Sequence, residues 1–238
     1  MRVDTSSANQ AIVWIDPGEH LYFSLTYLRG RDFGVPFLPP CPLGSPLIRL
    51  YHGCYWLGQY QAKQAGSEVR LTGPTVIGNF RAIELPAGSS CFLNCAHLVG
   101  FSFQRGGRLR TQMSGLLSPT MWALGHPLPV IAYGPGTIVV YGEGLHEVIV
   151  EPGAEYIPSQ VVSFDAARPF LARALNPDAG FLSHLANAVG QQARWVFRER
   201  TALQLVPINR PGLASSQIVL HLIAHILFWA LLVLMLNL

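Results

Sequence analysis

Two histidines near the C-terminal end are the residues whose type and spacing most directly suggest chemistry. His221 and His225 lie within residues 218–236, a run of nineteen residues without a charged side chain. Residues four apart share one face of a helix. Imidazole on that face could ligate haem iron or the magnesium of bacteriochlorophyll. Two other interpretations stay open: His225 hydrogen-bonds a neighbouring helix while His221 lies near lipid headgroups, or the histidines transfer protons.

The sequence around His225 contains one feature that matches the pigment interpretation. The run AHILFW at 224–229 resembles the Ala-His-Leu-x-x-Trp stretch of bacterial light-harvesting polypeptides. The resemblance implies that His225 holds bacteriochlorophyll and that Trp229 bonds its carbonyl. His221 stands where that stretch usually has a small residue. The sequence does not require a cofactor, and bacteriochlorophyll or haem at His225 is the candidate that it offers.

Arginines form a second group of candidate binding residues. Arg105, Arg108 and Arg110 lie close together in QRGGRLR, which reads as a glycine-containing loop. Guanidinium groups bind carboxylates and phosphates bidentately. The cluster could therefore contact lipid phosphate or an acidic partner surface, or it could be a solvated hairpin tip.

The cysteines do not form a convincing metal site. Cys91, Cys95 and His97 would project from one face of a strand, but residues four apart on a strand lie ~13 Å from end to end. That separation is too large for one zinc ion, and we expect buried thiols. The sequence also lacks a nucleophile elbow, a Walker loop, a dinucleotide fingerprint and an HExxH motif, which predicts a protein that is not an enzyme.

Three similar turns organise residues 11–165. The runs IVWIDPGEHLYF, IELPAGSSCFLNCAHLV and VIVEPGAEYIPSQVVSF each join two apolar strands through Pro-Gly or Pro-Ala-Gly. Proline fixes φ at the start of such a turn, and glycine accepts the positive φ that follows. Three units about 65 to 70 residues apart suggest a pseudo-threefold β architecture of stacked sheets or a barrel.

These turns resemble the altered-inheritance-of-mitochondria family, and the best match is GPGTIVVYGEGLHEVIVEPGAEYIPSQVVSFD at 134–165. The resemblance implies a β fold like that of the tryptophan RNA-binding attenuation protein over about residues 11–165. It implies a role in membrane organisation and biogenesis, without established catalytic residues. Residues 166–214 and the C-terminal run depart from the usual family member.

The remaining segments are predicted to be helical. After a tail at 1–10 and the β body at 11–165, we expect a juxtamembrane connector at 166–214 and a transmembrane anchor at 215–238. The connector contains a short helix at 166–175 and a longer one at 179–200. The longer helix either packs on the β body or lies on the membrane, with Arg194 and Arg198 at lipid phosphates and Trp195 at headgroup level.

The anchor determines the expected location and function. Its apolar run is ~28 Å long as a helix, close to the ~30 Å core of a bilayer. Basic residues precede it and none follows it, which predicts a cytoplasmic β body on the inner membrane. Charged residues are 12% of the chain, about half the usual share, so much of the surface should be hidden by folding, by self-association or by docking to partners. A net charge of +3 is too small to indicate nucleic acid binding.

We therefore expect a non-enzymatic, tail-anchored accessory or scaffold subunit that stabilises or helps assemble a larger membrane complex. The host would be bioenergetic, either photosynthetic or respiratory, and this choice depends on the two histidines. The alternative function is a cofactor-bearing subunit that ligates bacteriochlorophyll or haem. Self-association through the β body is a further expectation.

Overall fold

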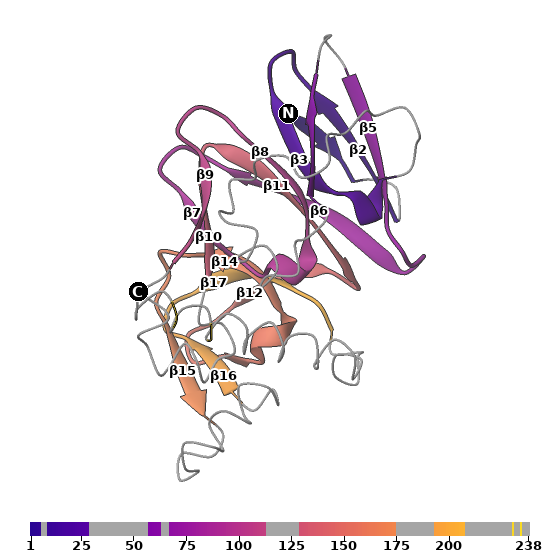
Figure 1. The fold of residues 1–238 in the computed structure, drawn as a ribbon. Coiled ribbons are helices and arrows are strands. Elements are labelled where there is room, and N and C mark those ends of the chain that lie inside the picture. Colours follow the sequence, from indigo (N-terminus) through magenta and orange to yellow (C-terminus); the bar gives the residue numbers. More distant parts are fainter. Residues whose placement is uncertain are drawn as a thin grey trace.

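The described residues form four antiparallel β-sheets (Figure 1). The computed structural model describes residues 1–5, 9–28, 57–62, 67–112, 129–174 and 193–207, with Ala230 and Leu234. Sheet A has the order β1 (Arg2–Asp4), β2 (Gln10–Ile15), β5 (Ser67–Thr72). Sheet B has the order β4 (Leu57–Gln61), β3 (His20–Ser24), β8 (Leu98–Phe103), β11 (Gly136–Glu143), β6 (Gly78–Leu85).

The other two sheets contain the later strands. Sheet C has the order β12 (His146–Val150), β17 (Thr201–Leu205), β14 (Val161–Asp165), β7 (Ser90–Leu93), β10 (Val130–Tyr133), β9 (Arg108–Thr111). Sheet D has the order β13 (Glu155–Tyr156), β16 (Ala193–Phe197), β15 (Phe170–Ala174). Within the part of the chain that the structure describes, three short 3-10 helices accompany them: η1 (Leu25–Tyr27), η2 (Cys95–His97) and η4 (Pro158–Gln160).

The sheets are stacked, and a separate apolar core fills each of the three spaces between them. One core joins sheets A and B, a second joins B and C, and a third joins C and D. In Figure 1 the stack runs from β2 and β5 at the upper right to β15 and β16 at the bottom. Strands in the middle are therefore buried on both faces. On β11, Val139 faces the first core and Val140 the second, which explains its nearly continuous apolar sequence.

The three predicted turns form, and they have the same geometry. Each has a backbone hydrogen bond from its fourth residue to its first, at 3.0 to 3.2 Å. The third residue is Gly18, Gly88 or Gly153, with φ of 83°, 82° and 90°. This is the arrangement of a type II turn, which needs positive φ at its third position. In each case the strand after the turn is followed by a 3-10 helix.

Strand pairing repeats along with the turns. The strand before each turn pairs with a later strand, as β2–β5, β6–β11 and β12–β17. The strand after each turn pairs as β3–β4, β7–β10 and β13–β16. Successive repeats are joined by β3–β8 and β7–β14. At the first junction a Cβ on Gly100 would lie 2.8 Å from the Tyr22 carbonyl oxygen, so glycine permits the close approach of the two backbones.

The predicted helical connector is wrong where the structure describes it. Residues 170–174 and 193–197 form β15 and β16, and 201–205 form β17. The physical reason is a period of two, because Trp195 and Phe197 alternate with Arg194 and Val196 and complete the core between sheets C and D. The fold class is therefore mainly β without that helical connector.

The predicted membrane anchor is not supported either. Across the described residues, no helix combines the length and apolar character needed to cross a bilayer. Within 215–238, Ala230 and Leu234 are the residues that are described, and each is helical. The rest of that range lies outside the described residues. The predicted assignment as a tail-anchored, single-pass inner-membrane protein with a cytoplasmic body is therefore unsupported, and we no longer propose it.

Candidate ligand-binding site

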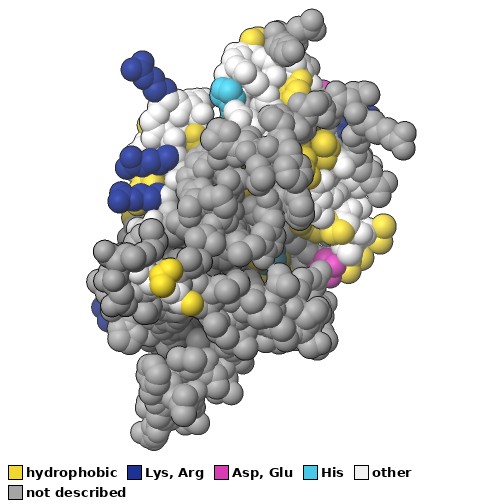
Figure 2. Space-filling model, in the orientation of Figure 1, with side chains coloured by type: hydrophobic (Ala, Val, Ile, Leu, Met, Phe, Trp, Pro, Cys, Tyr) yellow, Lys and Arg dark blue, Asp and Glu magenta, His cyan; other side chains and the backbone are white. Residues whose placement is uncertain are grey.

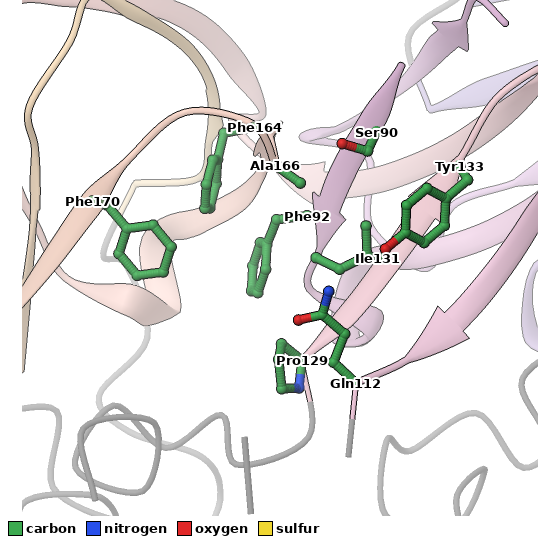
Figure 3. Close-up of a pocket in the computed structure, with 9 residues that line it drawn as sticks. All are labelled: Ser90, Phe92, Gln112, Pro129, Ile131, Tyr133, Phe164, Ala166 and Phe170. Atoms are coloured by element: carbon green, nitrogen blue, oxygen red, sulfur yellow. The ribbon is translucent and has the colours of Figure 1, made fainter. Parts of the chain in front are cut away.

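A pocket of about 240 Å³ opens on the face of sheet C that is turned toward sheet D. Strand register brings its apolar floor together, because Ile131 on β10 lies opposite Phe92 on β7, and Phe92 lies opposite Phe164 on β14. Phe170 of β15 approaches from sheet D (Figure 3). The lining residues are Ser90, Phe92, Gln112, Pro129, Ile131, Tyr133, Phe164, Ala166 and Phe170.

The closed side of the pocket is a cluster of aromatic rings. The Phe92 and Phe164 rings are stacked with centroids 4.9 Å apart. Trp195 meets Phe92 edge to face at 5.0 Å, and Phe170 lies 5.4 Å from Phe164. Phe92 and Phe164 are 3% exposed and Trp195 is fully buried. Such contacts hold the rings in fixed orientations, so the floor of the pocket is preformed.

Uncharged polar groups lie on the open side. Ser90 and Tyr133 face each other across β7 and β10, and both are half-buried. Gln112 is held by a backbone hydrogen bond from its N–H to the Pro129 carbonyl at 2.9 Å. Figure 3 shows its side-chain amide directed toward the gap between Phe92 and Ile131. The pocket therefore offers an apolar base with hydroxyl and amide groups near its mouth.

Two of the predicted arginines lie beside this pocket. Arg108 and Arg110 belong to β9 at the edge of sheet C, and Arg105 lies in the preceding turn. All three side chains are exposed. Figure 2 shows basic side chains gathered on the left of the molecule, where Figure 1 places β9. The cluster is thus partly a strand rather than a loop, and its neighbour is the aromatic pocket.

The other predicted contact residues are scattered. Trp195 is part of the core between sheets C and D, so its assignment to lipid headgroups is wrong. Arg194 is half-buried on the opposite face of β16, and Arg198 is exposed beyond the end of that strand. His221, His225 and Trp229 lie outside the described residues. The structure therefore does not bear on pigment or haem ligation.

The prediction of buried thiols is confirmed for two cysteines. Cys91 and Cys95 are buried thiols that are not part of a disulfide. Burial raises the pKa of the Cys91 thiol to about 12, with a smaller contribution from the nearby Asp165 charge. The residues that the structure describes contain no cluster of three or more His, Cys, Asp or Glu side chains suited to a metal ion.

Sequence reasoning missed the aromatic residues of the pocket. Tyr133 and Phe92 come from strands that are far apart in the sequence, and their shared face depends on the β7–β10 register. One signal was available for Phe170. The first two repeats each end in a pair of strands, so a third repeat predicts strands rather than a helix after Asp165.

Comparisons with known proteins bear on the fold alone. No protein-family model matches the chain, and no curated protein matches it. Among solved structures, the chain is similar to a Streptococcus pyogenes protein whose crystal structure was determined by a structural genomics consortium. The TM-score is 0.59 with 15% sequence identity, and the match covers 87% of this chain and 93% of that chain. At this identity, the similarity indicates a shared fold.

Proposed function

We propose that this protein is a non-enzymatic binding subunit, which serves as an accessory or scaffold part of a larger complex. The observation that carries the proposal is the aromatic pocket on sheet C. Its floor is fixed by stacked rings and by a sheet that has apolar cores on both sides. Preformed apolar pockets with a few polar groups are typical binding sites. The pocket therefore receives an apolar group of a ligand.

The experiment uses 2-naphthamide, a neutral two-ring probe, and isothermal titration calorimetry. Ala166 lines the pocket, whereas its neighbour Ala167 is exposed and does not. We expect saturable binding by the wild-type protein and by Ala167→Leu, because leucine at 167 points away from the cavity. Ala166→Leu should fill part of the pocket and weaken binding at least about tenfold. Absence of saturable binding by the wild-type chain, or equal binding by both variants, would refute the proposal.

The resemblance to the altered-inheritance-of-mitochondria family stays part of this proposal. It is supported by three type II turns at corresponding positions of the three repeats. A 3-10 helix also follows the strand after each of these turns. A scaffold role agrees with a body made of repeated, interlocked sheets. The choice of a photosynthetic or respiratory host depends on His221 and His225, which are not described, and it remains a prediction.

A further inference from the structure

The register of β9 with β10 determines where Arg108 and Arg110 point. Arg110 lies opposite Ile131, and Arg108 lies opposite Tyr133. Directly opposed residues of an antiparallel pair project from the same face of the sheet. Leu109 between them is 3% exposed in the core on the other face. Both guanidinium groups therefore extend from the face that carries the pocket, next to two of its lining residues.

The environment of these arginines leaves their charge available to a ligand. The Arg108 guanidinium lies over the Tyr133 ring, 5.6 Å from its centroid, which holds it at the wall of the pocket. Among the described residues, neither Arg108 nor Arg110 forms an ion pair. Asp165, which lies between the lining residues Phe164 and Ala166, is already engaged, since Arg168 pairs with Asp165 at 3.5 Å and with Glu199 at 2.9 Å. The β9 side of the pocket is therefore positively charged.

The size of the pocket restricts the ligand further. A volume of about 240 Å³ lies below the roughly 300–1,000 Å³ of sites for drug-sized molecules. One ring or two fused rings would fill it. Phe92 and Phe164, whose rings stack on each other, form an apolar wall against which such a ring can pack. A carboxylate on the ring would then lie toward β9, where arginine can bind it bidentately.

We infer that the pocket binds a small aromatic carboxylate, whose ring packs against Phe92 and Phe164 and whose anion is bound by Arg108 and Arg110. This inference rests on the proposed binding function, because it names the ligand class of the same pocket. It adds that negative charge on the ligand, and not apolar contact alone, determines affinity. Hydrogen bonds to charged groups contribute about 1.5–3 kcal/mol, which corresponds to roughly tenfold or more in affinity.

The test compares two ligands of nearly equal shape, 2-naphthoate and neutral 2-naphthamide, by calorimetry at low salt. Wild-type protein should bind naphthoate about tenfold more tightly. The double variant Arg108→Gln/Arg110→Gln should lose this preference and keep its affinity for naphthamide, which shows that the pocket is still folded. The matched control Arg2→Gln/Arg70→Gln removes the same charge from sheet A, and it should keep the preference.

The outcomes separate this inference from the function on which it rests. Equal binding of the two ligands by the wild-type protein would overturn the inference and leave the pocket as a site for neutral rings. A preference that survives in the Arg108→Gln/Arg110→Gln variant, or that disappears in the sheet A control, would also overturn it. Failure of both ligands to bind would refute the binding function itself.

Discussion

Cys91 is a cysteine whose buried surroundings suppress the nucleophilic reactivity of its thiol. It is 4% exposed in the core between sheets B and C, and its thiol donates a hydrogen bond to the Phe92 carbonyl at 3.1 Å. Thiolate is the nucleophilic form of cysteine, and burial in an apolar core disfavours it. Cys91 therefore behaves as a small apolar residue, one position away from the pocket residue Phe92.

The raised pKa of Cys91 predicts a pH-dependent stability. In the unfolded chain the thiol titrates near 9.0, and in the native protein near 12. Between these values the unfolded state releases a proton that the native state retains, so the free energy of unfolding falls as pH rises above 9. Below pH 9 this loss is absent. Urea unfolding between pH 8 and 10.5 should show a shallower decline for Cys91→Ala than for the wild-type protein. Parallel declines would contradict the assignment.

At the scale of elements, the three type II turns differ at one informative position. The second turn residue is proline at Pro17 and Pro152, but it is Ala87 in the middle repeat. Ala87 is exposed, and its N–H donates no backbone hydrogen bond to a described residue. Gly88 follows with φ of 82° and open space where a Cβ would lie. Substitutions at these two positions thus act on backbone conformation alone.

We expect Ala87→Pro to stabilise the protein by about 0.4–1 kcal/mol, because proline restricts the unfolded chain at a position already suited to it. Gly88→Ala should destabilise by about 1 kcal/mol, because positive φ is costly for alanine. Urea unfolding measures both changes. Two shifts in the same direction would be incompatible with a type II turn at 86–89.

The same elements indicate what the sequence could predict. Pro-Gly signals and β-branched runs are local, so the turns and most strands of residues 11–165 could be recognised. Residues 170–174 were misassigned because AARPFLARAL is rich in good helix formers, and tertiary packing overrode that local preference. The pocket could not be predicted from the sequence, because Arg108 and Tyr133 belong to paired strands that are separated by a long connection in the sequence.

The whole molecule is a stack in which each inner sheet contributes to two cores. Val139 and Val140 are adjacent on β11 and both fully buried, yet they belong to different cores. If one core were disrupted, one face of an inner sheet would be exposed. The same sheet forms part of the neighbouring core, so that core would also be weakened. The stack should therefore unfold as a unit, although its cores are separate.

Val139→Ala and Val140→Ala test this coupling. Each removes two buried methyl groups and should cost about 2 kcal/mol. Both variants should keep one unfolding transition, with coincident midpoints by far-UV circular dichroism and tryptophan fluorescence. A second transition in either variant, or midpoints that separate, would mean that the cores unfold independently.

The closure of each repeat on itself has a mechanical consequence. Gln10 pairs with Thr72, Gly78 with Glu143, and His146 with Leu205, so the chain enters and leaves each repeat side by side. Tension applied along the chain would load the hydrogen bonds of such a pair one after another, as in a zipper, rather than all together in shear. We therefore expect the molecule to unfold as one unit in denaturant but to yield readily when it is pulled, with its repeats opening one after another.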